Sequence, residues 1–205
     1  LVGLAGVVIG FSRGRRHTSI FSVTRGLTVA LLVDITAQQT FDWQKQVIYF
    51  ILIDRFHNGD SANDRDVSPK DPYAYHGGDL EGVIKRLPYL KDLGVTVLWL
   101  SPVFDNRDDR FFQYWAYHGY WPKDFFKVEE RFGEMDTLKR LSRAAQEKGM
   151  HLVLDMIVNH VDYNAPMVQE KPEWFHPYPA IQDWSNPLQI ERYRVHGLPD
   201  RKSVV

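Results

Sequence analysis

The sequence predicts an α/β fold built around a parallel sheet. The run His151–Val158 is apolar except for Asp155, which is typical of a strand covered on both faces. Two earlier apolar runs have the length of strands, and stretches with helical spacing separate the three runs. Because strands alternate with helices, we expect crossover connections and parallel pairing.

The first expected strand is Val47–Asp54, a β-branched and aromatic run followed by a turn-rich stretch. Apolar residues then recur at helical spacing over Leu80–Leu93, and Gly94 ends that helix. This stretch therefore predicts one strand–helix unit.

The second expected strand is Val95–Ser101, which Pro102 ends because proline cannot donate to the ladder. A helix is expected over Glu134–Lys148, with Gly149 as its C-terminal stop. The third strand is the His151 run. We expect this strand and the two earlier ones to lie side by side in the sheet.

The regular pattern stops after Val161. Residues Asp162–Asp200 are rich in Pro, Trp and Tyr and show neither helical nor strand periodicity. Such long irregular segments are uncommon in a compact domain unless they carry function. We interpret this segment as an excursion inserted after the third strand.

Composition limits the possible partners. The 205 residues are 44% hydrophobic, which is enough for one globular core, and their net charge of −1 gives no general attraction to nucleic acid. No apolar run reaches the ~20 residues that a membrane span needs. Cysteine is absent, which excludes disulfides, thiolate metal sites and cysteine nucleophiles within this sequence.

Residues 1–45 form a distinct N-terminal extension. A basic stretch through Arg25, an apolar run Leu27–Val33 and a small residue at Ala37 resemble a secretion signal cleaved after Ala37. That interpretation predicts a secreted or periplasmic protein. The alternative is upstream sequence translated in front of the true start, and both interpretations stay open.

Polar residues gather where the third strand ends. Asp155 lies inside the strand, and Asn159 and His160 follow it. Ligands bind at the carboxyl ends of parallel strands, and a buried aspartate is costly unless it has partners. For His160 alone, a structural histidine is the alternative interpretation.

The segment Tyr117–Trp121 lies between the second strand and the next helix. His118, Tyr120 and Trp121 offer stacking faces and an imidazole, and we expect them near Asp155. The alternative is that the aromatic rings cap the core and the histidine bridges backbone groups.

A third set of polar residues follows the first strand. Its oxygen-bearing side chains are Asn58, Asp60, Asn63 and Asp64, and Gly77, Gly78 and Asp79 come later. Calcium takes six to eight oxygen ligands, so this loop could wrap one ion. The alternative is a solvated turn, and the spacing differs from that of an EF-hand loop.

Four motifs in order resemble one family. They are VIYFILIDRFHNGD, YHGGDLEGVIKRLPYLKDLGVTVLWLSPVF, AYHGYWPKDFFKVEERFG and DMIVNH. The match resembles the α-amylase superfamily, glycoside hydrolase family thirteen, and most of all its cyclodextrin glucanotransferases and other maltodextrin-acting members. It implies a substrate that is an α-linked glucan or maltodextrin.

The resemblance implies a domain organisation. Residues 46–161 would be the first three βα units of a (β/α)8 TIM barrel, and 162–199 the start of inserted domain B. The relatives continue with Leu-Asn after Gly-Leu-Pro-Asp, whereas Arg-Lys-Ser-Val-Val follows here. We therefore expect residues 200–205 to be a non-native tail.

The resemblance also implies residue roles. His160 and His118 would hydrogen-bond the sugar at the cleaved bond, Tyr120 would stack on it, and Asp155 would hold the local network. Trp121 belongs to the same substrate-binding set. The implied calcium ligands are Asn58, Asp60, Asn63, Asp64, Gly77 through its backbone oxygen, and Asp79. Asn159 would bind a calcium ion between barrel and inserted domain.

The family's nucleophile and proton donor follow its fourth and fifth strands, so neither is assignable within this sequence, and we expect an inactive fragment. Three strands cannot close a barrel, so the third should have an unpaired, aggregation-prone edge. One alternative is a non-catalytic relative that serves as a carbohydrate-binding or interaction module. Another is a generic α/β domain with a metal-stiffened loop. No feature of the sequence fixes an oligomeric state.

Overall fold

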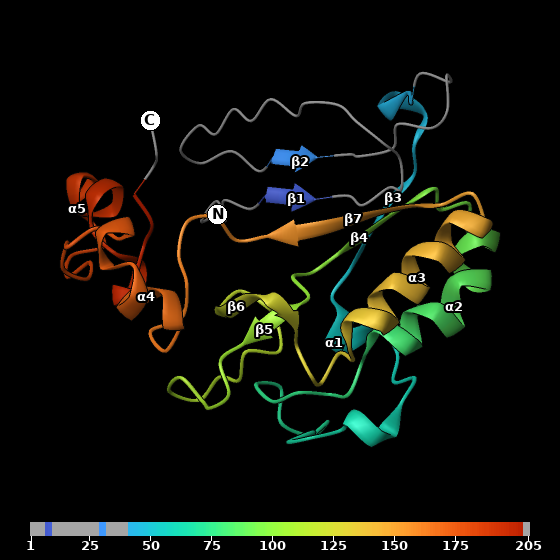
Figure 1. Cartoon of the computed structure of the whole chain (residues 1–205), viewed down its shortest axis with the longest axis horizontal. Helices are drawn as coiled ribbons and strands as arrows, with labels where there is room; N and C mark the ends of the chain where they lie inside the picture. Colours follow the sequence, from blue (N-terminus) through green and yellow to red (C-terminus); the bar gives the residue numbers. More distant parts are fainter. Residues whose placement is uncertain (1–6, 10–28, 32–40, 203–205) are drawn as a thin grey trace.

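The computed structural model describes residues 7–9, 29–31 and 41–202 (Figure 1). Most of the predicted signal-like segment up to Ala37, and residues 203–205 of the predicted tail, lie outside the described residues. Among the helices that the structure describes, none has the length and apolar character needed to cross a membrane.

The three predicted strands form a parallel sheet in the order β3–β4–β7. Their bounds are Ile48–Ile51 for β3, Val97–Leu100 for β4 and His151–Met156 for β7. Strand β3 is shorter than predicted because its last residues turn into the short helix α1, Ile53–Phe56. The prediction of an α/β fold with parallel pairing is confirmed.

The sheet continues beyond β7. Strand β1, Val7–Ile9, pairs antiparallel with Leu154–Met156, and β2, Val29–Leu31, pairs parallel with β1 (Figure 1). The expectation that the third strand has an unpaired edge is therefore wrong over Leu154–Met156. A short strand from the N-terminal region supplies the backbone partners for this part of β7.

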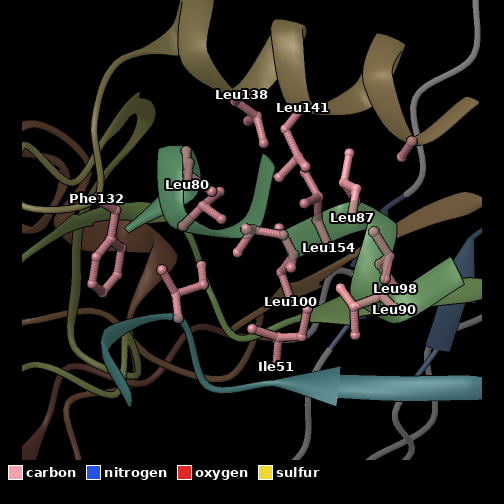
Figure 2. Close-up of a cluster of buried hydrophobic side chains, with 14 of the residues drawn as sticks. Ile51, Leu80, Leu87, Leu90, Leu98, Leu100, Phe132, Leu138, Leu141 and Leu154 are labelled. Atoms are coloured by element: carbon pink, nitrogen blue, oxygen red, sulfur yellow. The ribbon is translucent and has the colours of Figure 1, made fainter. Parts of the chain in front are cut away.

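Helices α2, Leu80–Asp92, and α3, Met135–Glu147, lie side by side along the sheet (Figure 1). Both match the predicted helices within one residue at each end. Arg140 and Glu81 join them through an ion pair of 2.7 Å. Figure 2 shows Leu138 and Leu141 pointing from α3 toward the leucines of α2 and the strands.

Alternation along the strands gives the sheet two different faces. Leu98 and Leu100 belong to the main core under the helices, whereas Val97 and Trp99 belong to a smaller cluster on the other face. On β7, Leu154 is in the main core, so its neighbour Asp155 faces away from the helices. The charged residue of the buried strand thus lies on the helix-free face.

A hairpin that the sequence did not predict follows β4. Strands β5, Phe104–Asn106, and β6, Pro122–Val128, pair antiparallel with register shifts at both steps. The remaining described elements are short: 3-10 turns at Trp43–Lys45, Ser61–Asn63, Pro172–Trp174 and Val195–Gly197, and helices α4, Pro166–Glu170, and α5, Pro187–Arg192.

The last described residues lie against the segment that follows β7. His160 and Asp200 form a bridge, the Arg201 amide donates to the Asn159 carbonyl at 2.7 Å, and the Lys202 amide donates to the Trp174 carbonyl at 2.7 Å. The division of the chain at residues 46, 162 and 200 stays a prediction.

Candidate functional site

The structure brings together the five residues predicted to bind substrate. Asp155 comes from β7, His160 follows that strand, and the other three precede β6. We call His118, Tyr120, Trp121, Asp155 and His160 the Tyr120 cluster. It lies where β4 and β7 end, on the face of the sheet that the helices do not cover.

The central contact is between Tyr120 and Asp155. The tyrosine hydroxyl donates to Oδ2 of the buried carboxylate at 2.9 Å. Burial raises the pKa of Asp155, and the hydrogen bond from Tyr120 offsets part of that rise. Burial and the neighbouring carboxylate both raise the pKa of Tyr120, so its hydroxyl keeps its proton and remains a donor.

Trp99 is a neighbour of Asp155 that sequence reasoning missed. Its indole side chain lowers the pKa of Asp155, although its Nε1 has no hydrogen-bond partner within ordinary distance among the described residues. Oδ1 of Asp155 also has no hydrogen-bond partner among the described residues. Trp99 lies on the neighbouring strand β4, where it pairs in register with Val153 of β7. A tryptophan inside a buried strand was the available signal.

His118 is held as a neutral ring. Its Nδ1 accepts a hydrogen bond from the Tyr120 amide at 2.9 Å, and its ring stacks on that of Tyr120 at 5.8 Å and 23°. Burial, with a smaller contribution from His160, lowers the pKa of His118 to about 4. Because Nδ1 accepts, the neutral ring carries its proton on Nε2, which is a donor for a ligand.

His160 braces the backbone of the same segment. Its Nε2 lies 3.0 Å from the Tyr120 carbonyl oxygen, which can only accept, so Nε2 carries a proton. Asn159 Nδ2 lies 3.3 Å from the other ring nitrogen. Burial lowers the pKa of His160. The two histidines are therefore neutral near pH 7.

Gly119 allows the turn between His118 and Tyr120. Its φ is +84°, and its amide donates to the Ala116 carbonyl at 2.9 Å. A Cβ atom at this position would lie 2.4 Å from the carbonyl oxygen of Pro102. Any larger residue would clash with the backbone of Pro102 and displace the Tyr117–Trp121 segment from the end of β4.

A buried ion pair holds the segment that follows His160. Arg107 Nη1 lies 3.0 Å from Asp162 Oδ2, with the two side chains 12% and 0% exposed. The Asp162 amide also donates to the Pro122 carbonyl at 2.8 Å. This pair joins the β5–β6 hairpin to the segment after His160. The acidic residue in that segment was the only sequence signal for it.

The two interpretations of the Tyr117–Trp121 segment each describe part of it. Tyr117 packs against the main core beneath the Arg55 guanidinium, and His118 does bond a backbone amide. Tyr120 instead turns toward Asp155, and Trp121 contacts His118 at 4.6 Å.

The second candidate site is the loop that we call the Asn58 loop, residues 58–64 together with 76–79. Asn58 Nδ2 donates to both oxygens of Asp64, at 2.9 and 2.8 Å. A Cβ atom on Gly77 would lie 2.7 Å from Asn58 Nδ2 and 2.7 Å from Asp64 Oδ1. Three of the predicted ligands therefore meet at one point.

Asp79 is engaged differently. Its carboxylate is fully buried and accepts from the Gly82 amide at 2.6 Å, as the N-cap of α2. It also accepts from the amides of Gly59 at 3.1 Å and Asp60 at 2.8 Å. This carboxylate orders the loop by binding its backbone. The Asp60 side chain similarly accepts from the Ala62 amide at 3.0 Å.

Asp54 is a further residue of this region that the sequence analysis did not select. Its Oδ1 accepts from the amides of His76 at 2.8 Å and Gly77 at 3.3 Å, and its other oxygen pairs with Arg55 at 2.9 Å. Burial raises the pKa of Asp54. The carboxylate at the end of the first predicted strand thus positions Gly77.

Part of the Asn58 loop fits a hard cation. The buried Oδ1 of Asn63 has no hydrogen-bond partner among the described residues, and Asp64 and the Gly77 backbone lie beside Asn58. Nowhere among the described residues do three or more His, Cys, Asp or Glu side chains form a group that could hold a metal ion. Any ion here would depend on amide and backbone oxygens in addition to Asp64.

Comparison with known proteins gives a consistent result. A family model described as the alpha-amylase catalytic domain matches residues 50–191. The chain is 38% identical to the beta/alpha-amylase of Paenibacillus polymyxa over 173 residues, covering 78% of this chain and 14% of that protein. It is 32% identical to a cyclomaltodextrin glucanotransferase of Klebsiella oxytoca, covering 78% of this chain and 28% of that protein.

Structural similarity agrees with the sequence matches. The crystal structure of an Anoxybacillus alpha-amylase superimposes with a TM-score of 0.71 and 45% identity, covering 80% of this chain and 35% of that one. The chain therefore spans only part of these three proteins, between 14 and 35% of their length.

Proposed function

Because this chain belongs to the alpha-amylase catalytic-domain family, we propose that it is part of a retaining glycosidase or transglycosidase that acts on α-linked glucans. The parallel strands β3, β4 and β7 would be the first three strands of its TIM barrel, and residues 162–199 the start of its inserted domain. The Tyr120 cluster would then hold one glucose unit of the substrate.

The observation that carries this proposal is the hydrogen-bonded link between Tyr120 and Asp155. It connects a stacking ring to a buried carboxylate at the strand ends, where barrel enzymes bind their ligands. The Tyr120 ring would lie against the apolar face of the sugar. The Nε2–H of His118 would donate to a sugar hydroxyl, and Asp155 would keep Tyr120 in place.

His160 would act through backbone support and through the sugar. Its Nε2 already binds the Tyr120 carbonyl, so contact with a hydroxyl requires this bond to be shared or exchanged. Trp121 would limit access of water, since its ring packs against His118. Each of these roles prepares the substrate without breaking a bond.

Cleavage needs two carboxyl groups that flank the glycosidic bond, about 5–5.5 Å apart in retaining enzymes. Among the described residues, Asp155 is the carboxylate of the Tyr120 cluster, and it is engaged with Tyr120. We therefore expect this chain to bind maltooligosaccharides and not to cleave them by itself. The nucleophile and proton donor would come from later strands of the enzyme.

Calorimetric titration with maltotriose tests the binding role. We expect the chain to bind maltotriose in preference to cellotriose, its β-linked counterpart. Tyr120→Ala should weaken binding at least about tenfold, because it removes both the ring and the hydroxyl. Tyr120→Phe should have a smaller effect, since it keeps the ring.

The matched control is Tyr89→Ala, which removes an exposed tyrosine from helix α2. It should leave the affinity unchanged. Equal affinity for maltotriose and cellotriose, or unchanged affinity after Tyr120→Ala, would contradict the proposal.

We also propose that Ca²⁺ binds the Asn58 loop. Asn58, Asn63 and Asp64 would supply side-chain oxygens and Gly77 its carbonyl, after the Asn58 amide turns its oxygen toward the ion. Asp60 could add a ligand, and Asp79 would keep the loop in shape. The ion would stiffen the loop and take no part in bond cleavage.

Thermal melting in the presence and absence of calcium tests this site. Calcium at 100 times its Kd should raise the free energy of unfolding by about 2.7 kcal/mol. Asp64→Asn should abolish the shift, while Asp92→Asn, the same charge change at an exposed position of α2, should keep it. A shift that survives Asp64→Asn would contradict the assignment.

Asn159 would contribute to a separate calcium site between the barrel and the inserted domain. Its side chain is exposed beside His160, and its carbonyl accepts from Arg201. We propose that secretion or periplasmic export accompanies this function, as the segment up to Ala37 suggests.

A further inference from the structure

Phe112 occupies an unusual position. Phe111 and Tyr114 exchange two backbone hydrogen bonds, of 2.9 and 3.1 Å, so Phe112 and Gln113 form the tip of a tight turn. Phe112 has a φ of +54°, and 83% of it is exposed. Bulky residues rarely adopt this backbone region, where glycine or asparagine is usual. Phe112 therefore combines a strained backbone conformation with an apolar ring that is exposed to solvent.

A line of aromatic contacts connects this ring to the Tyr120 cluster. Phe112 contacts Phe111 at 4.7 Å, and Phe111 contacts Trp121 at 5.5 Å. Trp121 contacts His118 at 4.6 Å, and His118 stacks on Tyr120 at 5.8 Å. The intermediate rings are all partly exposed. A continuous series of apolar surfaces thus leads from the cluster to the turn.

The base of the turn is held in place. The Arg107 guanidinium lies 5.5 Å from the centre of the Phe111 ring and 5.9 Å from that of Tyr163. The same guanidinium forms the buried ion pair with Asp162. Phe111 packs against Arg107, and Arg107 is held by its ion pair with Asp162. These contacts fix the base of the turn, and therefore the position of Phe112 relative to the Tyr120 cluster.

Phe126 shows that exposure alone is not the distinguishing feature. It is 87% exposed and lies within strand β6, without a positive φ. Among the described residues it makes no ring contact that joins it to the aromatic line. Within the described part of the chain, Phe112 alone combines exposure, backbone strain and a connected path to the Tyr120 cluster.

We infer that Phe112 is a distal platform for the substrate, on which a glucose unit stacks several units away from the one held at Tyr120. This inference rests on the proposed function. An α-linked glucan presents an apolar ring face at every unit, so a long chain can contact both ends of the aromatic line at once. A short chain fills only the cluster, and the platform therefore selects for chain length.

The test compares maltose with maltoheptaose by titration of the whole chain. Phe112→Ala should weaken binding of maltoheptaose about three- to tenfold and leave the affinity for maltose unchanged. Phe126→Ala is the matched control, since it removes an equally exposed phenylalanine from the neighbouring strand. It should change neither affinity.

Phe112→Gly adds a second measurement. Glycine relieves the positive φ, so this variant should melt at a higher temperature than the original chain while losing the same affinity for maltoheptaose. A higher melting temperature together with a weaker preference for long chains would show that the strained backbone at Phe112 lowers stability but serves substrate binding.

The outcomes separate this inference from the proposed function. If the chain binds maltose but its preference for maltoheptaose is unaffected by Phe112→Ala, the platform is refuted and the proposed function stands. Equal losses with Phe112→Ala and Phe126→Ala would also refute it, because they would indicate general surface adhesion. If neither sugar binds the original chain, the proposed function fails and the platform fails with it.

Discussion

In the Tyr120 cluster the side chains bond one another or the backbone of Tyr120, whereas in the Asn58 loop the carboxylates of Asp60 and Asp79 bond several backbone amides. Tyr120, Asp155 and the two histidines are largely withdrawn from water, and burial shifts the pKa values of all four. Asn58 and Asp60 are exposed, and the buried Asp79 serves the helix and the loop backbone.

This difference indicates two ways of preparing a site. The cluster is ordered before a ligand arrives because Tyr120 bonds Asp155 and both histidines bond the Tyr120 backbone, and it offers few but well-oriented donors. The loop has an ordered backbone, and its buried Asn63 Oδ1 has no hydrogen-bond partner among the described residues. A cation would complete the loop, whereas a neutral sugar would be received by the cluster.

The largest expected effect comes from removing the carboxylate on which the loop backbone depends. Asp79→Ala would remove a fully buried carboxylate and leave the amides of Gly59, Asp60 and Gly82 without their acceptor. We expect the free energy of unfolding to fall by about 3–5 kcal/mol, as measured by denaturant titration.

Asp92→Ala, at an exposed position on the last turn of α2, provides the comparison. It should cost less than about 0.5 kcal/mol. A similar small cost for Asp79→Ala would show that the backbone of the Asn58 loop is held by other contacts.

The next effect concerns acid stability of the cluster. The pKa of His118 in the folded chain is about 4, below its usual value, so the unfolded chain binds this proton more readily. Stability is therefore full above pH 6.5 and falls as the pH drops toward 4, by up to about 3 kcal/mol from this residue. His118→Gln should flatten the dependence of unfolding free energy on pH in that range, and an unchanged slope would contradict the assignment.

The smallest effect on stability is expected for Asp155→Asn. Burial raises the pKa of Asp155 in the folded state, so its ionised form burdens the fold at pH values above that pKa. Asparagine still accepts from Tyr120 without the charge, so unfolding free energy at pH 7 should stay equal or rise. Maltotriose affinity should nevertheless fall about two- to threefold, less than after Tyr120→Phe, because a neutral acceptor holds the Tyr120 hydroxyl more weakly. Loss of both stability and affinity would mean that the carboxylate supports the fold itself.

Periodicity predicted the regular part of this chain well. The strands β3, β4 and β7 and the helices α2 and α3 follow from apolar spacing together with stops at Gly94 and Gly149. The meeting of Tyr120 with Asp155 followed from a general property of parallel sheets, because residues at their carboxyl ends converge. Neither conclusion needed a long-range contact to be known.

What the sequence did not predict depends on contacts between distant residues. Strand β5 is three residues long with shifted register, so it leaves no periodic signal. Arg107 and Asp162 are separated by 55 residues, and only the fold shows that they pair. Asp79 has the residue type of a metal ligand and also that of a helix cap, and local sequence does not tell the two apart.

Indole N–H resonances, followed by NMR during titration with maltotriose, report whether a glucose unit binds at the Tyr120 cluster. The sequence has six tryptophans, of which Trp99 and Trp121 lie at the cluster. If glucose binds there, these two resonances should shift, while those of the exposed Trp43, Trp174 and Trp184 should stay unchanged. Shifts confined to the exposed tryptophans, with Trp99 and Trp121 unchanged, would contradict binding at the Tyr120 cluster.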